Sequence, residues 1–289
     1  MKFILKQMAH APMIYQILVD LRALYLSSKS RLFSILSGFK PLNREEFKYD
    51  KDILFILGSG SSVNKLTDEH WAVIKEQVSI GINFWVLHKF IPDFYSIENP
   101  GDKKVFQVYK EAFQRKDIQE KKPYILFFSK KNSFYRGLLP HYLLSNIRTY
   151  TRISSSERKR NDLKKSIRKI FNRMKSGRLP SNILYGQGAS LERLVCFGIF
   201  LGVKKIVLVG VDLNNVSYFW ENSGLFDNID SGQNGTLHKT ADPDKKRLTV
   251  IDTLPLLSEI LKEDYSIELF IESDKSMLAG PLRVFSWQS

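Results

Sequence analysis

The chain has 289 residues, and its 44 Lys and Arg against 30 Asp and Glu give a formal net charge of +14. With 43% apolar residues, a chain of this length can bury a substantial core, which excludes intrinsic disorder for most of it. Cys196 is the only cysteine, which excludes an internal disulfide and a cysteine-based zinc cluster and favours a reducing compartment. We find neither a run of about 20 apolar residues nor a secretory signal, so we expect a protein that is not exported.

The first predicted element is an amphipathic helix, or a helix pair, in the N-terminal segment 1–45. Apolar residues recur at helical spacing from Ile14 to Leu36, until Gly38 and Pro41 end the pattern. Two interpretations remain open: a helix packed on the rest of the domain, and a helix on a membrane surface. The second is favoured by basic residues, because basic amphipathic helices bind anionic lipid. These are Lys2, Lys6, Arg22, Lys29, Arg31 and Lys40.

Residues 46–289 are predicted to form a single α/β domain. Strands are predicted at 53–57, 79–82, 94–97, 124–128, 206–211 and 267–271, and helices at 190–201 and 248–261. This alternation predicts a Rossmann-like, doubly wound, mostly parallel sheet. Ligands of such sheets bind beyond the carboxyl ends of the strands.

Segment 145–180 interrupts the alternation and is predicted to be an added basic helical insert. Between Arg152 and Arg178 there are eleven basic residues against Glu157 and Asp162, a local net charge of 11 − 2, or +9. Apolar residues at helical spacing favour an amphipathic helix here. A solvated helix face, a contact with an anionic membrane or glycolipid, and nucleic-acid binding remain open. We expect no nucleic-acid partner, because no known binding motif accompanies the charge.

The glycine turn 58–62, with the sequence GSGSS, follows the first strand of the domain. Such a turn brings backbone N–H groups close to a ligand and can hold phosphate where it opens a helix. It has neither the Lys-Ser/Thr pair of a Walker loop nor the third glycine of the dinucleotide fingerprint. A plain structural turn is the alternative interpretation.

Two further motifs lie between the strand that ends near Asp212 and the helix that begins near Leu248. His238 lies in a polar stretch and can accept a proton near neutral pH; a histidine in a surface loop is the alternative. Asp242-Pro243-Asp244 has the Asp-x-Asp pattern of metal-dependent glycosyltransferases, but a turn is the simpler interpretation, and we expect no metal site. The long polar region 213–245 is predicted to be a lid.

Six segments in the same order resemble bacterial sialyltransferases of glycosyltransferase family 42. They are the glycine turn, Gly81-Ile82-Asn83-Phe84, Ser96-Ile97-Glu98-Asn99-Pro100, the stretch from Ser190 to Asp212, Leu237-His238-Lys239 and Ser276-Met277-Leu278-Ala279. The resemblance covers residues 52–100 and 185–285. It leaves out the N-terminal segment and the basic insert.

The resemblance implies that domain 46–289 binds a nucleotide sugar and is a GT-A-like variant of the fold. It also implies a metal-independent, inverting glycosyl transfer that needs no cofactor. The donor would be CMP-activated sialic acid or a related nonulosonate, and the acceptor a hydroxyl of a bacterial surface glycan or lipid-linked oligosaccharide. His238 would be the general base, and Tyr218 would bind the departing phosphate. The donor-binding residues would be Gly58, Ser59, Gly60, Ser61, Ser62, Asn83, Asn99, Ser190, Gly210, Asp212, Asn214 and Lys239. We expect the protein to lie in the bacterial cytoplasm, bound to the anionic inner face of the cytoplasmic membrane. A homo-oligomer is a further possibility that stays open.

The sequence departs from the family at Ser59, at Ser190-Leu191 and at Asn214, where the family has Asn, a Ser-Gly pair and a second tyrosine. These departures leave open another CMP-activated acid, such as 3-deoxy-manno-octulosonate, as the donor. Two other functions also stay open. One is a non-catalytic nucleotide-binding or membrane-surface module, and the other is a pterin pyrophosphokinase-like enzyme that needs metal-bound ATP.

Overall fold

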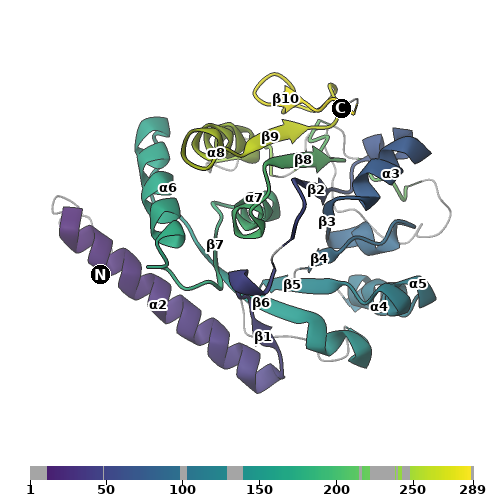
Figure 1. The fold of residues 1–289 in the computed structure, drawn as a ribbon, viewed down its shortest axis with the longest axis horizontal. Helices are drawn as coiled ribbons and strands as arrows, with labels where there is room; N and C mark the ends of the chain where they lie inside the picture. The colour runs from purple at the N-terminus through teal and green to yellow at the C-terminus, as the bar shows by residue number, and fades with distance from the viewer. Residues whose placement is uncertain are drawn as a thin grey trace.

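A parallel β-sheet runs through the centre of the molecule (Figure 1). The computed structural model describes residues 12–47, 49–97, 103–128, 139–214, 217–221, 238, 240–242 and 248–287. Within these residues the sheet has ten strands in the order β1-β6-β5-β4-β3-β2-β8-β9-β10, with β7 beside β6. Each of these strand pairs is parallel. The predicted doubly wound α/β fold is therefore confirmed.

The strands are Lys40–Pro41 (β1), Ile53–Leu57 (β2), Val78–Ile82 (β3), Phe94–Ile97 (β4), Tyr124–Phe128 (β5), Ile147–Ile153 (β6), Ile183–Tyr185 (β7), Lys205–Val209 (β8), Glu268–Ile271 (β9) and Arg283–Val284 (β10). The α-helices are Pro12–Ser37 (α2), Asp68–Lys75 (α3), Lys103–Ala112 (α4), Lys116–Lys121 (α5), Arg160–Lys175 (α6), Ser190–Leu201 (α7) and Val250–Tyr265 (α8). Short 3-10 helices lie at Arg44–Glu46 (η2), Ser61–Lys65 (η3), Asn83–Leu87 (η4) and His141–Asn146 (η5).

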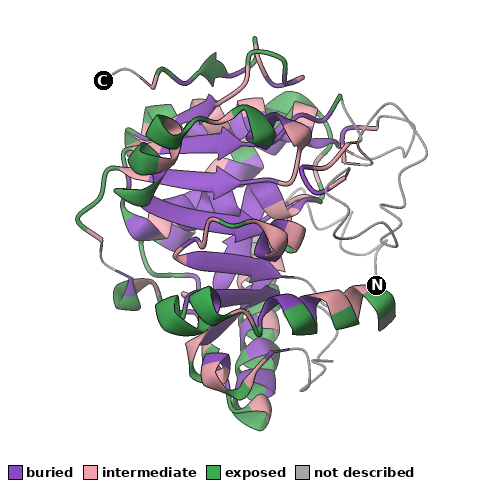
Figure 2. Cartoon of the chain, turned by 90° about the vertical axis from the view of Figure 1, so that its right-hand side faces the viewer, coloured by how far each residue is buried: buried purple, intermediate pink, exposed green. Residues whose placement is uncertain are grey.

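Helices cover both faces of the sheet. Figure 1 shows α6, α7 and α8 on one face and α3, α4 and α5 on the other. The strand side chains alternate accordingly: Leu54 and Ile56 of β2 join the core under α7 and α8, whereas Phe55 and Leu57 join the core under α3 and α4. Strands buried on both faces are continuous apolar runs, and Figure 2 shows them buried. For this reason β2, β3, β4, β5, β8 and β9 lie where the sequence predicts them.

The segment predicted as a basic insert, 145–180, contains strand β6 of the sheet, and strand β7 follows it at Ile183. β6 pairs with β5 on one side and with β1 and then β7 on the other. The helix between β6 and β7, α6, is therefore a crossover helix of the fold and not an addition to it. Strand β6 is not predicted from the sequence because charged residues interrupt its apolar pattern. One of them, Arg148, is 3% exposed; it pairs with Glu46 and lies over the ring of Tyr124.

The basic side chains of α6 are largely matched by acids of its neighbours. Three of them pair with acids of α8: Arg160 with Glu259, Lys164 with Glu259 and Glu263, and Arg168 with Glu263 and Asp264. Arg173 pairs with Asp20 of α2. The apolar face of α6 is buried. Much of the local positive charge is thus used within the fold.

The N-terminal helix α2 is a single helix that packs against β6 with an unusual face. Its buried positions are Ala23, Phe33 and the hydroxyl residues Ser27, Ser30 and Ser34. Ser27 donates to Asn182 Oδ1 at 2.6 Å, and Ser34 is hydrogen-bonded to Thr149 of β6. The apolar stripe that the sequence predicts lies on the opposite, exposed side.

None of the described helices combines the length and the apolar character that crossing a membrane requires.

Candidate functional site

The order in which the chain adds strands to the sheet reverses between β2 and β8, which are parallel neighbours. From β2 the chain adds β3, β4, β5 and β6 in turn on one side, and it returns to place β8 and β9 on the other. In open parallel sheets the crevice at such a switch point, beyond the carboxyl ends of the strands, is where ligands bind. Here the two segments that flank this point are the glycine turn after β2 and residues 210–214 after β8.

The glycines of the turn allow the two segments to touch. The N–H groups of Gly58 and Gly60 donate to the carbonyls of Val209 and Gly210 at 2.7 and 2.8 Å. A Cβ atom on Gly58 would lie 2.6 Å from the carbonyl oxygen of Gly210, and one on Gly60 would lie 2.5 Å from Asp212 Oδ2. Gly210 has φ +64°, which favours glycine. The glycines are thus required by the close approach of two backbones.

Asp212 fastens the glycine turn from the other side of the switch point. Its carboxylate accepts the N–H of Ser62 at 3.0 Å and the hydroxyl of Ser62 at 2.5 Å. Both residues are less than a tenth exposed. The turn leads into η3, a 3-10 helix of five residues, and α3 begins only at Asp68. The turn therefore leads into a short 3-10 helix and does not open an α-helix, which a phosphate-holding turn would do. The Ser62 N–H is bonded within the protein.

Tyr218 lies against the same turn. It forms an antiparallel bridge with Gly60, and the N–H of Phe219 donates to the Ser59 carbonyl at 3.1 Å. The Tyr218 ring stacks on Trp220 with 4.4 Å between ring centroids. The structure thus brings Tyr218 to the glycine turn.

His238 is attached to the segment that follows Asp212. Its N–H donates to the carbonyl of Leu213 at 3.0 Å, and Leu213 has the strained φ of +62°. The ring Nδ1 lies 2.7 Å from the hydroxyl of Thr240 and 3.3 Å from the N–H of Thr240. The Thr240 N–H donates to Nδ1, whereas the Thr240 hydroxyl can donate to Nδ1 or accept from it, so the contacts with Thr240 affect which ring nitrogen carries the proton. No sequence signal singled out Thr240.

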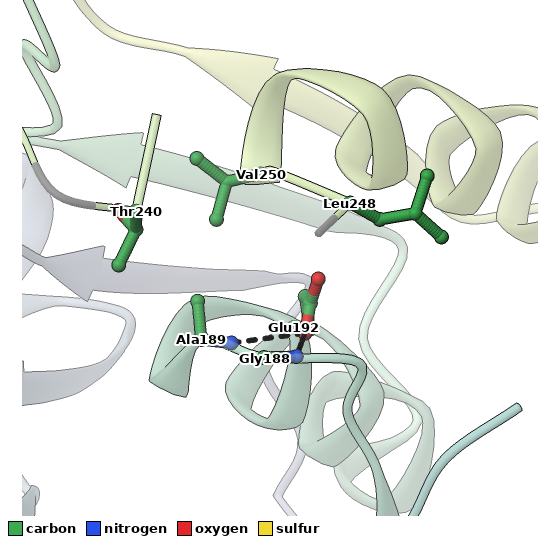
Figure 3. Close-up of a pocket in the computed structure, with 6 residues that line it drawn as sticks. All are labelled: Gly188, Ala189, Glu192, Thr240, Leu248 and Val250. Atoms are coloured by element: carbon green, nitrogen blue, oxygen red, sulfur yellow. Dashed lines mark hydrogen bonds between the residues drawn. The ribbon is translucent and has the colours of Figure 1, made fainter. Parts of the chain in front are cut away.

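A small pocket lies next to Thr240 (Figure 3). It is lined by Gly188, Ala189, Glu192, Thr240, Leu248 and Val250. Figure 3 shows Glu192 bonded to the loop that precedes α7. Ser190, the first residue of α7, comes directly after this loop. The pocket thus connects the His238 segment with the segment that carries Ser190.

Glu192 holds that loop in place. It is 1% exposed, and one oxygen accepts the N–H groups of Gln187, Gly188 and Ala189 at 2.6, 2.7 and 3.1 Å. The other oxygen accepts the hydroxyl of Thr253 at 2.5 Å. Carboxylates that accept several N–H bonds at a helix start are stabilised there. The only signal in the sequence was a Glu in the first turn of a helix.

The carboxyl edge of β9 adds a second acid near Asp212. Burial, and after it the negative charge of Asp212, raise the pKa of Glu272 to about 7. Glu272 Oε2 is buried and makes no hydrogen bond to a described residue. Nearby, the N–H of Met277 donates to the Asp212 carbonyl at 3.3 Å, and Ser276 donates to that of Val211 at 2.6 Å. The Ser276-Met277 motif thus supports the segment after β8.

The structure describes some of the other predicted donor-binding residues and leaves the rest outside the described part of the chain. Asn83 follows β3 with a left-handed φ of +51° and is exposed, and the Ser59 hydroxyl donates to Ile82 at 3.5 Å beside it. Asn214 donates to the carbonyl of Lys275 at 2.7 Å. Ser61 begins η3 and is partly exposed, and Ser190 accepts a hydrogen bond from Arg193 at 2.9 Å. Asn99, Lys239, Asp244 and most of the predicted lid 213–245 lie outside the described residues.

Other titratable groups belong to the core. Burial lowers the pKa of His88 to about 4, with Lys89 and Arg115 nearby, and its ring lies 4.5 Å from that of Trp85. Burial raises the pKa of the Cys196 thiol to about 12. Among the described residues no group of three or more His, Cys, Asp or Glu side chains lies close enough to hold a metal ion.

No known family model and no curated protein matches the sequence. Among solved structures, the chain is similar to the Maf glycosyltransferase of Magnetospirillum magneticum AMB-1, with a TM-score of 0.50 and 15% identity over 86% of this chain. The chain spans 36% of the length of that protein. It is also similar to the sialyltransferase CstII of Campylobacter jejuni in complexes with CMP and with CMP-3FNeuAc. The TM-scores are 0.43 and 0.42, with 15% and 16% identity over 83% and 82% of this chain and 87% of CstII. At 15% identity the likeness to the Maf protein concerns the fold alone, a parallel α/β fold.

Proposed function

We propose that this protein is an inverting glycosyltransferase that uses a CMP-activated donor, sialic acid or a related nonulosonate, and needs no metal. The acceptor would be a hydroxyl of a surface glycan or a lipid-linked oligosaccharide. The observation that carries the proposal is the position of His238. Its backbone N–H is hydrogen-bonded to Leu213, the residue after Asp212, whose carboxylate is hydrogen-bonded to the glycine turn. A proton acceptor thus lies at the switch point of a parallel sheet, where ligands of such sheets bind.

The proposed step follows from the charges of the donor. The acceptor oxygen attacks the anomeric carbon and gives its proton to His238, while the bond to the phosphate oxygen of CMP breaks and the phosphate takes the electron pair. A sugar hydroxyl has a pKa far above 7, so a base with a pKa near the working pH accelerates the attack. Tyr218, which lies at the glycine turn, would donate to the departing phosphate, and such donors stabilise charge that develops in the transition state.

The orientation of the imidazole is part of the proposal. For Nε2 to carry the lone pair that accepts the acceptor proton, Nδ1 must hold the ring proton and donate it to the Thr240 hydroxyl across 2.7 Å, instead of accepting the Thr240 N–H at 3.3 Å. The protein then uses a hydroxyl where other enzymes use a carboxylate to fix the tautomer of a catalytic histidine.

The experiment is His238→Ala, measured with CMP-activated acids as donors in the presence of EDTA. We expect kcat to fall about 10²- to 10⁴-fold, the usual contribution of general acid–base catalysis. The stabilisation of the protein by CMP in a thermal unfolding scan should persist, because the histidine acts on the acceptor side. His141→Ala, on the exposed 3-10 helix η5, is the matched control and should keep full activity.

If His238→Ala kept most of its turnover, His238 would not be the general base, and this mechanism would be wrong. Transfer or CMP binding that disappears on chelation would show that the donor is held through a metal. Stabilisation by UDP or by ATP with magnesium, and not by CMP, would favour a different nucleotide substrate.

A further inference from the structure

The outward face of α2 carries an exposed apolar surface. The side chains of Ile17, Leu21, Leu24, Tyr25, Leu32, Ile35 and Leu36 are between 48% and 73% exposed. With about 3.6 residues per turn, these positions form one stripe, opposite the Ala23 and serine side that packs against β6. We name these seven residues the α2 stripe. Soluble monomers rarely expose a contiguous apolar surface of this kind unless it binds something.

The side chains that border the stripe are basic. Lys29 and Arg22 lie along one margin and Arg31 along the other, and all three are exposed. Within the described part of the chain, the ion pairs of α2 are confined to Asp20 with Arg173. Asp20 is also the one acidic residue between Pro12 and Ser37. The apolar stripe is therefore flanked by cations whose charge is not matched by an acid of the same helix.

We propose that the α2 stripe binds the surface of an anionic lipid bilayer, with α2 lying in the plane of the interface. An apolar face bordered by Lys and Arg is the composition of interfacial helices, whose apolar side enters the headgroup boundary while the cations meet anionic lipid. Tyr25, which is 66% exposed, has the amphipathic ring that favours this depth.

Charge complementarity distinguishes lipid from a second copy of this chain as the occupant. Two α2 stripes packed against each other across a two-fold axis would bring Arg22, Lys29 and Arg31 near their own counterparts, with no free acid on the helix to pair with them. Like charges held close together destabilise an interface. An anionic membrane presents the opposite charge over the whole length of the helix.

The same reasoning assigns the binding surface to α2 and not to α6. The basic residues Arg160, Lys164 and Arg168 of α6 pair with acids of α8, and the apolar side of α6 is inside the fold. The α2 stripe has both components of an interfacial helix on one exposed face. The proposal does not depend on the function of the site at the switch point.

The test is flotation of the full chain with vesicles of neutral phosphatidylcholine or of phosphatidylcholine mixed with phosphatidylglycerol, at low and high salt. We expect binding to the anionic vesicles at low salt, weakened about tenfold or more at high salt or with neutral vesicles, because the cations are screened or have no partner. Leu24→Ser with Leu32→Ser should abolish binding, and Arg22→Gln with Lys29→Gln and Arg31→Gln should remove its salt dependence. Val73→Ser and Lys75→Gln on α3 are the matched controls and should bind as the wild type does.

Thermal unfolding of each variant shows whether it is folded, and exposed positions of this kind should leave the melting temperature nearly unchanged. Wild-type flotation of the Leu24→Ser, Leu32→Ser protein would overturn the proposal. So would a dimer in sedimentation that the same double variant dissociates, combined with no binding to vesicles, because the occupant would then be a second copy.

Discussion

At the scale of single residues, Thr240 is the side chain whose role the structure adds to the proposed chemistry. Its hydroxyl is 2.7 Å from His238 Nδ1, and its backbone carbonyl accepts the N–H of Val250 at 3.1 Å. The backbone bond keeps the residue in place whatever its side chain. A substitution of Thr240 therefore tests the orientation of His238 with little change to the fold, and Thr240 acts as a positioning residue.

We expect Thr240→Val to lower kcat about tenfold and to leave KM for the donor nearly unchanged, because the imidazole loses the bond that fixes its tautomer. The pH at which activity is half-maximal should also shift, which a purely structural defect would not produce. Thr240→Ser keeps the hydroxyl and should restore the wild-type profile. Equal pH profiles for the Val variant and the wild type would show that Thr240 does not act through His238.

Glu272 allows a second residue-scale prediction, on stability. Its pKa of about 7 lies above the ordinary value of 4.5, so between these pH values the folded protein holds a proton that the unfolded chain releases. The free energy of unfolding therefore falls as the pH rises from about 4.5 to about 7, by up to about 3 kcal/mol. The physical cause is the burial of a charge beside Asp212.

Glu272→Gln removes the titrating group and should flatten this part of the curve. In urea unfolding we expect the Gln variant to be more stable than the wild type at about pH 8 and similar at about pH 5. Glu76→Gln, at an exposed position after α3, is the control and should follow the wild type. Parallel curves for Glu272→Gln and the wild type would contradict the prediction.

At the scale of elements, the glycine turn is a joint between β2 and β8. Gly58→Ala would place a Cβ atom 2.6 Å from the backbone oxygen of Gly210, and a backbone atom cannot move aside as a side chain can. We expect the free energy of unfolding to fall by about 1–3 kcal/mol and CMP binding to weaken as the turn is displaced. Thermal or urea unfolding measures the first effect and a thermal shift with CMP the second.

The matched control for this joint is Gly188→Ala. Nothing lies within 4 Å of a Cβ atom built on Gly188, and its φ is not in the left-handed region. Alanine should be neutral or slightly stabilising there, since it lowers the entropy of the unfolded chain. If Gly58→Ala proved as stable as Gly188→Ala, the close contact between the two segments would not be important for the fold.

The two amphipathic helices show what an element's sequence does and does not predict. Periodicity predicted both α2 and α6, because helical spacing of apolar residues is a local property. Which face packs on the sheet depends on the partner. Hydroxyl residues of α2 bond to Asn182 and Thr149 inside the fold. The helix therefore packs through its serine side, together with Ala23 and Phe33, and leaves its apolar stripe exposed. The sequence of the helix alone could not predict that choice.

At the scale of the whole molecule, much of the fold was predictable because the central strands are apolar runs between turn residues. β6 was not, since Arg148 and Arg152 interrupt its pattern, and their charges are met by Glu46 and by the ring of Phe128. The residue types of the candidate site were predicted through motifs. Thr240, Glu192 and Glu272 were missed, because their roles come from contacts with residues that are distant in the sequence.

The long separation between the two halves of the switch point also affects how the protein is made. Ser62 and Asp212 are 150 residues apart, so at a typical rate of synthesis β2 leaves the ribosome on the order of 10 to 30 s before the strand that will lie beside it. During that time β2, which is apolar on both faces, has an uncovered edge of the kind that invites pairing with other chains. Newly made chains are therefore most vulnerable to aggregation before their last third emerges, and the site cannot exist until that third arrives.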